Sequence, residues 1–225
     1  MPFFTHDGIQ FHYRDTGDGV PFVFQHGLGA DTAQVFDLFR PPPGFRLLAF
    51  DSRAHGETRP VGAEEKINVA QFADDLRVFL DHLQIKRAII GGISMGAAMA
   101  LHFALTHPAR VRGLVLSRPA WLDQSRAGHM QPFTTLAALI RQHGAREGAD
   151  QFQKTAAYRQ VRQVSPDNAA ALLAQFSHPR AEETVAKLER IPAHVPGHTR
   201  DDWKRIAVPT LVLANRQDAI HPFEF

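Results

Sequence analysis

The sequence has no cysteine. Without thiols the chain can form neither disulfide bonds nor thiolate metal sites. This suits a reducing compartment, and we expect the protein in the cytoplasm. Runs of five basic residues are also missing, and the net charge is only +2. Nucleic-acid binding needs clustered Lys and Arg, so we expect no nucleic-acid partner.

Long apolar runs are missing as well. The longest one, residues 88–101, is interrupted by Ser94 and falls short of the roughly 20 residues that a membrane span requires. The first eight residues, MPFFTHDG, lack the basic region and the apolar core of a secretory signal. We therefore expect no membrane partner. A chain of 225 residues, 44% hydrophobic and 21% charged, has the composition of a globular domain, and its length allows one full domain with an inserted subdomain.

Apolar segments that read as strands alternate along the chain with segments whose apolar residues have helical spacing. This alternation predicts the α/β class, with a mostly parallel central sheet and flanking helices. The predicted strands are residues 3–6, 9–15, 20–25, 45–50, 87–93, 111–119 and 208–215, and the predicted helices are residues 30–40, 68–84 and 95–108.

The alternation stops in the second half of the chain. Residues 122–200 carry helical signals and no convincing strand, including the helix start at Ser165 and Pro166. We predict that residues 1–121 and 201–225 form an α/β core and that residues 122–200 form a helical insertion.

The motif GISMG at residues 92–96 carries the strongest chemical signal. It matches G-x-S-x-G between a predicted buried strand and a helix rich in small residues, where a tight turn projects the serine hydroxyl above the sheet. The alternative is a chance helix start with small residues. The context favours Ser94 as a nucleophile.

A second signal is the glycine-rich segment QHGLG at residues 25–29, which follows the third predicted strand. Here the backbone N–H of Leu28 could join that of Met95 to form an oxyanion hole. One such donor is worth about 2.7–4 kcal/mol in the transition state. The alternative is an ordinary turn.

With two further segments, these motifs resemble the α/β-hydrolase fold family. The matching segments are residues 26–29, 51–56, 92–96 and 209–218, in the order of the family. The arrangement looks most like the small cofactor-free esterases, enol-lactonases and non-haem haloperoxidase-like members. Ala54 stands where the family usually has glycine. Residues 51–56 are then structural.

The resemblance implies a serine hydrolase with no cofactor and no metal. By this resemblance Ser94 is the nucleophile, Leu28 and Met95 supply the oxyanion N–H groups, and Asp218 orients the base. The substrate would be a small-molecule carboxylic ester or lactone, cleaved through an acyl-enzyme on Ser94. The helical insertion resembles the family's cap. Its apolar residues either line an acyl pocket or pack within the cap; they are Trp121, Phe133, Leu136, Leu139 and Phe152.

The histidine base is the main departure from the family. In this fold it follows the acid after one further strand, but only seven residues follow Asp218. The resemblance therefore predicts a core that is incomplete at its C-terminus, lacking the last strand, the histidine and the last helix, with the base beyond Phe225. Within the sequence, His221 and His26 are the substitutes that we weigh.

Two functions stay open. The first is a serine hydrolase whose natural chain is longer. Loss of the base in a comparable serine enzyme costs about 10⁶-fold in kcat, so without one the 225-residue chain would be nearly inert. The second is a catalytically inactive hydrolase-like protein that binds a small ligand or a partner. Residues 208–215 would form an exposed apolar edge strand, which would allow a homodimer.

Overall fold

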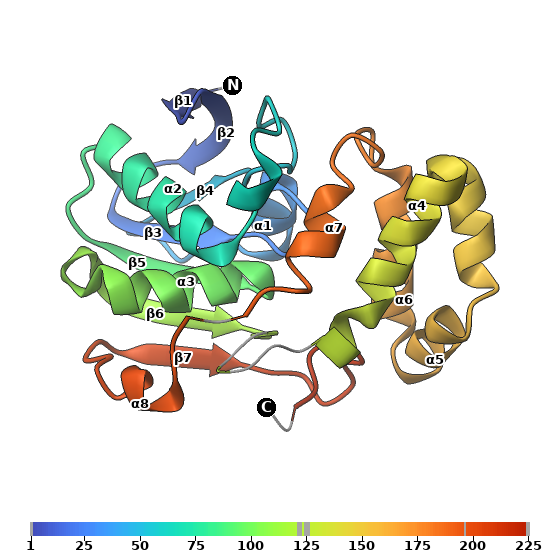
Figure 1. The fold of residues 1–225 in the computed structure, drawn as a ribbon. Helices are drawn as coiled ribbons and strands as arrows, with labels where there is room; N and C mark the ends of the chain where they lie inside the picture. Colours follow the sequence, from blue (N-terminus) through green and yellow to red (C-terminus); the bar gives the residue numbers. More distant parts are fainter. Residues whose placement is uncertain (1, 121–122, 124–126, 196, 224–225) are drawn as a thin grey trace.

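The computed structural model describes residues 2–120, 123, 127–195 and 197–223. Its centre is a seven-stranded sheet with the order β1-β2-β4-β3-β5-β6-β7 (Figure 1). The first two pairings, β1–β2 and β2–β4, are antiparallel, and the other four are parallel. This confirms the predicted α/β class. The strands are β1 (Phe3–His6), β2 (Ile9–Thr16), β3 (Val20–Gln25), β4 (Phe45–Phe50), β5 (Ala88–Ile93), β6 (Val111–Ser117) and β7 (Thr210–Leu213).

The register of the parallel strands brings their carboxyl ends together. Gln25 at the end of β3 pairs with Gly92 near the end of β5. Ile93 pairs with Ser117 at the end of β6, which in turn pairs with Leu213 at the end of β7. The segments that follow these strands therefore leave the sheet at one edge, which is where open α/β sheets place their ligand sites.

Helices cover both faces of the sheet. On β4, Leu48 and Phe50 belong to the main core, whereas Leu47 and Ala49 pack in a second cluster with Val35 of the first helix. Side chains alternate between the faces of a strand, so α1 lies on one face and the α2–α3 layer on the other. The bounds are α1 (Thr32–Leu38), α2 (Val69–His82) and α3 (Met95–Thr106).

The longest apolar run of the sequence is divided between two elements. Its first part forms β5 and the rest enters α3, a 12-residue helix whose residues from Met95 to Leu101 are all buried. In the described part of the chain, no helix combines the length and the apolar character needed to cross a membrane.

The described residues between β6 and β7 are mostly helical. The helices from α4 to α7 pack on one another beside the sheet's carboxyl edge, with α7 nearest the sheet, whereas α8 lies beside the start of β7 at the other end (Figure 1). Phe152 is fully buried and packs against the rings of Tyr158 and Phe176, so it belongs to the interior of this helical segment; Trp121 lies outside the described residues. The bounds are α4 (Ala127–Gln153), α5 (Ala156–Val164), α6 (Pro166–Ala174), η3 (Gln175–Ser177), α7 (Ala186–Arg190) and α8 (Arg200–Trp203).

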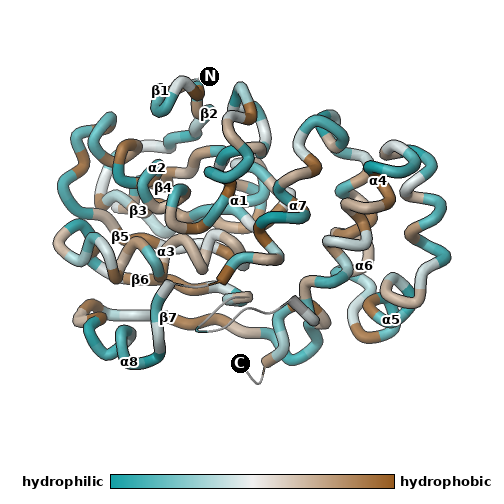
Figure 2. The backbone as a smooth tube through the Cα atoms, viewed as in Figure 1, coloured by the Kyte–Doolittle hydropathy of each residue, from teal (hydrophilic) through white to brown (hydrophobic). Residues whose placement is uncertain are grey.

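Strand β7 forms an exposed edge of the sheet. It pairs with β6 only, and Leu211, Val212 and Leu213 are each about half exposed, at 53%, 57% and 47%. Figure 2 shows this strand as a hydrophobic stretch. The exposed apolar edge agrees with the expectation from the sequence.

Candidate functional site

Ser94 occupies a tight turn between β5 and α3. Its backbone has φ 54° and ψ −112°, a region that a residue with a side chain adopts only when its surroundings force it. The Ser94 N–H donates to the carbonyl of Ser117 at the end of β6, with an N–O distance of 2.9 Å. The turn is thus fixed from the neighbouring strand.

Two glycines make this turn sterically feasible. A Cβ on Gly92 would lie 2.3 Å from the carbonyl carbon of Gly96, and a Cβ on Gly96 would lie 2.3 Å from the carbonyl oxygen of Gln25. Both contacts are with backbone atoms, which cannot move aside without distorting β3 or α3. The first and last residues of the GISMG motif are therefore required by close packing around Ser94.

The loop after β3 lies beside Ser94. A Cβ on Gly27 would be 3.7 Å from the Cβ of Ser94. Among the described residues, the backbone N–H groups of Leu28 and Met95 have no hydrogen-bond acceptor. N–H groups without an internal acceptor are what an oxyanion hole requires. The assignment of these two donors stays a prediction.

Two buried histidines form hydrogen bonds with the backbone of this loop. The Nε2 atom of His26 accepts from the Ser52 N–H at 3.0 Å, so its Nδ1 carries the proton and donates to the Gly27 carbonyl at 2.8 Å. His55 Nε2 accepts from the Gly29 N–H at 3.1 Å in the same way. Burial lowers the pKa of both imidazoles, which keeps them neutral. With both nitrogens bound to backbone, His26 lies next to the site as a support for the loop.

His221 contacts the serine. Its Nε2 lies 2.8 Å from Ser94 Oγ, and its Nδ1 lies 3.0 Å from Oδ2 of Asp218. An ionised carboxylate only accepts hydrogen bonds, so Nδ1 carries the proton and Nε2 is free to accept from the serine hydroxyl. The structure thus brings together Ser94, His221 and Asp218, three residues singled out in the sequence.

Asp218 accepts hydrogen bonds from other residues besides His221. The side chain is fully buried, and it accepts from Asn168 Nδ2 at 2.7 Å and from Arg118 Nε at 2.6 Å. The backbone N–H of Ile220 also donates to it, at 3.0 Å. Burial raises the pKa of Asp218, but the bonds from His221 and the charge of Arg118 outweigh it and hold the pKa well below its usual range. The carboxyl group is therefore ionised.

Sequence reasoning missed Arg118 and Asn168. Arg118 directly follows β6 at the carboxyl edge, in the left-handed region with φ 49°, and its position after a central strand could have marked it. Asn168 lies in α6, where its contact with Asp218 has no local sequence signal because the two residues are 50 positions apart.

Among the described residues, no group of three or more His, Asp or Glu side chains is arranged to hold a metal ion. The described contacts offer the chemistry of a hydroxyl within hydrogen-bond reach of a base, which is itself oriented by a carboxylate. That arrangement activates a nucleophile for acyl transfer.

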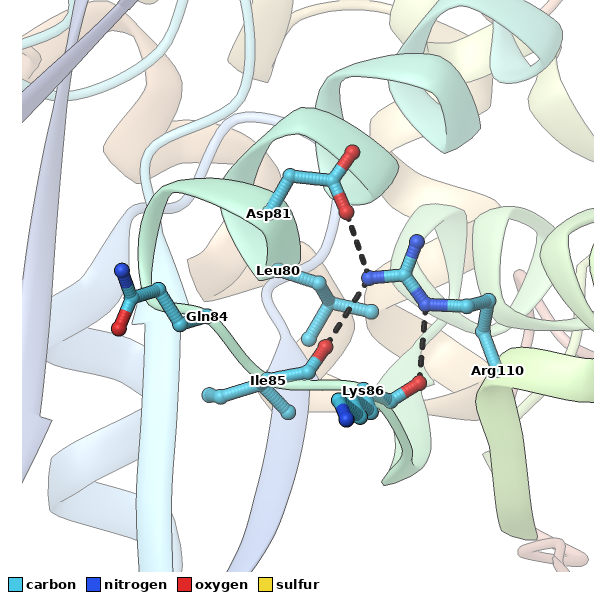
Figure 3. A pocket seen from close by; sticks show the side chains of 6 residues that line it. All are labelled: Leu80, Asp81, Gln84, Ile85, Lys86 and Arg110. Atoms are coloured by element: carbon cyan, nitrogen blue, oxygen red, sulfur yellow. Dashed lines mark hydrogen bonds and ion pairs between the residues drawn. The ribbon is translucent and has the colours of Figure 1, made fainter.

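A separate surface hollow lies at the opposite, amino-terminal end of β5. Figure 3 shows the guanidinium of Arg110 bound there. Its Nε donates to the Lys86 carbonyl at 2.9 Å and its Nη2 to the Ile85 carbonyl at 3.0 Å. The same Nη2 forms an ion pair with Oδ1 of Asp81 at 2.7 Å. Because these partners fix the turn between α2 and β5, we interpret this arginine as structural. The lining residues are Leu80, Asp81, Gln84, Ile85, Lys86 and Arg110.

Comparisons with known proteins show what the chain is similar to. Residues 20–222 match the family described as alpha/beta hydrolase fold. The chain is 25% identical to 3-oxoadipate enol-lactonase 2 of Acinetobacter baylyi, over 93% of this chain and 81% of that protein. It is 27% identical to a non-heme haloperoxidase of Rhodococcus erythropolis, over 99% and 84%. Among solved structures, the enol-lactonase from Burkholderia xenovorans LB400 is similar with a TM-score of 0.68 and 26% identity, over 94% and 80% of the two chains.

Proposed function

Since the chain belongs to the α/β-hydrolase fold family, we propose that it is a serine hydrolase that cleaves a carboxylic ester or lactone through an acyl-enzyme on Ser94. The observation that carries this proposal is the contact of His221 Nε2 with Ser94 Oγ at 2.8 Å, while Nδ1 of the same ring is bound to Asp218. The proposal thus uses a base inside this sequence, His221, and does not depend on one beyond Phe225.

The proposed reaction has two steps. His221 takes the proton of Ser94 Oγ as the oxygen attacks the substrate carbonyl, and Asp218 stabilises the imidazolium that forms. The N–H groups of Leu28 and Met95 stabilise the oxyanion. His221 then returns the proton to the leaving alkoxide. In the second step His221 takes a proton from water as the water oxygen attacks the acyl carbonyl. It passes this proton to Ser94 Oγ as the bond between Oγ and the acyl group breaks, which releases the carboxylic acid and restores the serine hydroxyl.

The substrate class is part of the proposal. The relatives named enol-lactonase support a lactone, because they match this chain over nearly its whole length. With a lactone, the leaving alkoxide stays attached to the acyl group, so one hydroxy acid leaves the enzyme. We expect the helical segment between β6 and β7 to act as the cap over this substrate, and we expect no cofactor.

The test is intact mass after exposure to a fluorophosphonate, a reagent that reacts with activated serines. We expect one adduct on the parent chain and none on Ser94→Ala. His221→Gln should label at least about 10³-fold more slowly, because the base is gone. His143→Gln, at a partly exposed histidine in α4, is the matched control and should label as the parent does.

Two outcomes would contradict the proposal. A parent chain that gains no adduct would refute the serine mechanism and leave a ligand-binding or partner-binding role for the site. If His221→Gln labelled at the parent rate, the serine would be active but His221 would not be its base. A separate assay defines the substrate class. We expect the parent chain to hydrolyse simple aryl esters or lactones and Ser94→Ala to hydrolyse neither.

A further inference from the structure

The carboxyl group of Asp218 is held by two side chains from different parts of the fold. Asn168 reaches it from α6, and Arg118 reaches it from the end of β6. Each takes a different oxygen: Asn168 bonds Oδ1 and Arg118 bonds Oδ2. The carboxylate plane is therefore fixed from both sides, and with it the direction in which Asp218 meets the His221 ring.

The amide of Asn168 is itself oriented. Ser165 Oγ donates to Asn168 Oδ1 at 2.7 Å, which leaves the NH₂ group to face Asp218. Ser165 also caps the N-terminus of α6. The helix start and the acid are thus joined by a continuous chain of hydrogen bonds. Both Asn168 and Asp218 are about 5% exposed, so water does not compete for this contact.

We propose that Asn168 and Arg118 are positioning residues that hold Asp218, and through it His221, for the reaction at Ser94. This inference rests on the proposed function. Asn168 lies in α6, so the helical segment takes part in catalysis even without touching the substrate. When α6 packs against the loop after β7, Asn168 donates a hydrogen bond to Asp218. Neither residue touches the reacting atoms.

The two residues act by different physics. Asn168 is neutral, so it fixes geometry. Arg118 carries a charge, so besides donating a hydrogen bond it favours the ionised carboxylate of Asp218. The described contacts bring two charged groups to His221 and its acid, Asp218 from the loop after β7 and Arg118 from the end of β6, while α6 contributes the neutral Asn168 and Ser165.

The experiment measures the rate constant of fluorophosphonate labelling at Ser94 as a function of pH. For Asn168→Ala we expect a plateau rate about 10-fold lower, since small misplacements of catalytic groups cost up to about 100-fold, and an unchanged pH midpoint. For Arg118→Met we also expect a plateau rate about 10-fold lower, because Asp218 loses the charged donor to its Oδ2 atom.

Gln163→Ala on α5 and Arg112→Met on β6, both at exposed positions, are the matched controls and should reproduce the parent profile. If Asn168→Ala only lowers the labelled fraction, with the parent rate constant for the rest, its role is structural and the inference is wrong. A parent rate constant in Arg118→Met refutes the positioning role of Arg118. Should Asn168→Ala fail to fold, Arg118→Met decides alone. A parent chain that takes no label refutes the proposed function and this inference together, whereas a labelled parent with unaltered variants refutes this inference only.

Discussion

Lys187 is a charged group buried between α7 and the core. Its side chain is 3% exposed, and its Nζ donates to the Ala54 carbonyl at 2.9 Å and to Thr184 Oγ1 at 3.0 Å. Burial, and secondarily the charge of Arg180, lowers the pKa of Lys187 from 10.5 to about 7. The bond to Ala54 joins the helical segment to the loop that follows β4, whereas the bond to Thr184 lies within the helical segment.

This lowered pKa sets the sign of a pH effect on stability. Between pH 7 and 10.5 the unfolded chain holds a proton on Lys187 that the folded chain has lost, so stability rises with pH in this window. Below pH 7 the lysine is protonated in both states and the folded state carries the full cost. A difference of 3.5 pKa units at about 1.4 kcal/mol each gives an upper bound of about 5 kcal/mol.

The perturbation is Lys187→Met, which keeps the aliphatic length and removes the charge. We expect the free energy of unfolding of the parent minus that of the variant to rise by about 1.4 kcal/mol per pH unit between pH 7 and 10. At pH 6 the variant should be the more stable chain by about 2 kcal/mol, because loss of the buried charge outweighs the unpaired Ala54 carbonyl.

The assay is urea unfolding at fixed salt from pH 6 to 10, followed by circular dichroism. Taking the difference between parent and variant cancels the titration of all other groups. Lys154→Met, at an exposed lysine of the helical segment, is the control and should give a flat difference. A flat difference for Lys187→Met would refute the reasoning, because it would mean that the lysine is hydrated in the folded state.

Three further predictions follow from the local geometry. Ser94→Gly relieves the positive φ of the turn and should raise the free energy of unfolding by about 1 kcal/mol in a urea titration while abolishing the label; a destabilised variant would contradict the strain. Gly96→Ala forces a Cβ against the Gln25 carbonyl and should lower the free energy of unfolding by about 3 kcal/mol in the same titration. Its control is Gly128→Ala, where an added Cβ has no atom within 4 Å and should cause no loss of stability. Val212→Lys on the exposed edge of β7 should change stability by less than about 0.5 kcal/mol and lower any self-association seen by size-exclusion chromatography; an unchanged oligomeric state would argue against pairing through this edge.

The sequence predicted the fold class because its signals are local. The helix at Val69–His82 lies within the predicted residues 68–84, since the Asn68 cap and the apolar spacing of α2 are properties of adjacent residues. The same is true of the turn at Ser94. The glycines at 92 and 96 are needed within a few residues of the serine, so a short motif records them.

The contact of His221 with Ser94 could not be predicted in this way. By the pattern of the family the base was expected beyond Phe225, and His221 was only a substitute. Its contact with Ser94 joins residues 127 positions apart, and it depends on where β7 ends relative to β5. The relative position of these two strand ends is set by the register of β5, β6 and β7, and register cannot be read from the sequence.

The local chemistry can be recognised in the sequence: a tight turn at a serine, a glycine-rich loop and an acid after a late strand. The partners of these groups depend on how the chain packs. The pairing of β5, β6 and β7 puts Ser94, Arg118 and Asp218 at one edge, and the packing of α6 adds Asn168. Hydrogen bonds of this kind act over about 3 Å, so residues far apart in the chain become partners only when the whole core has packed.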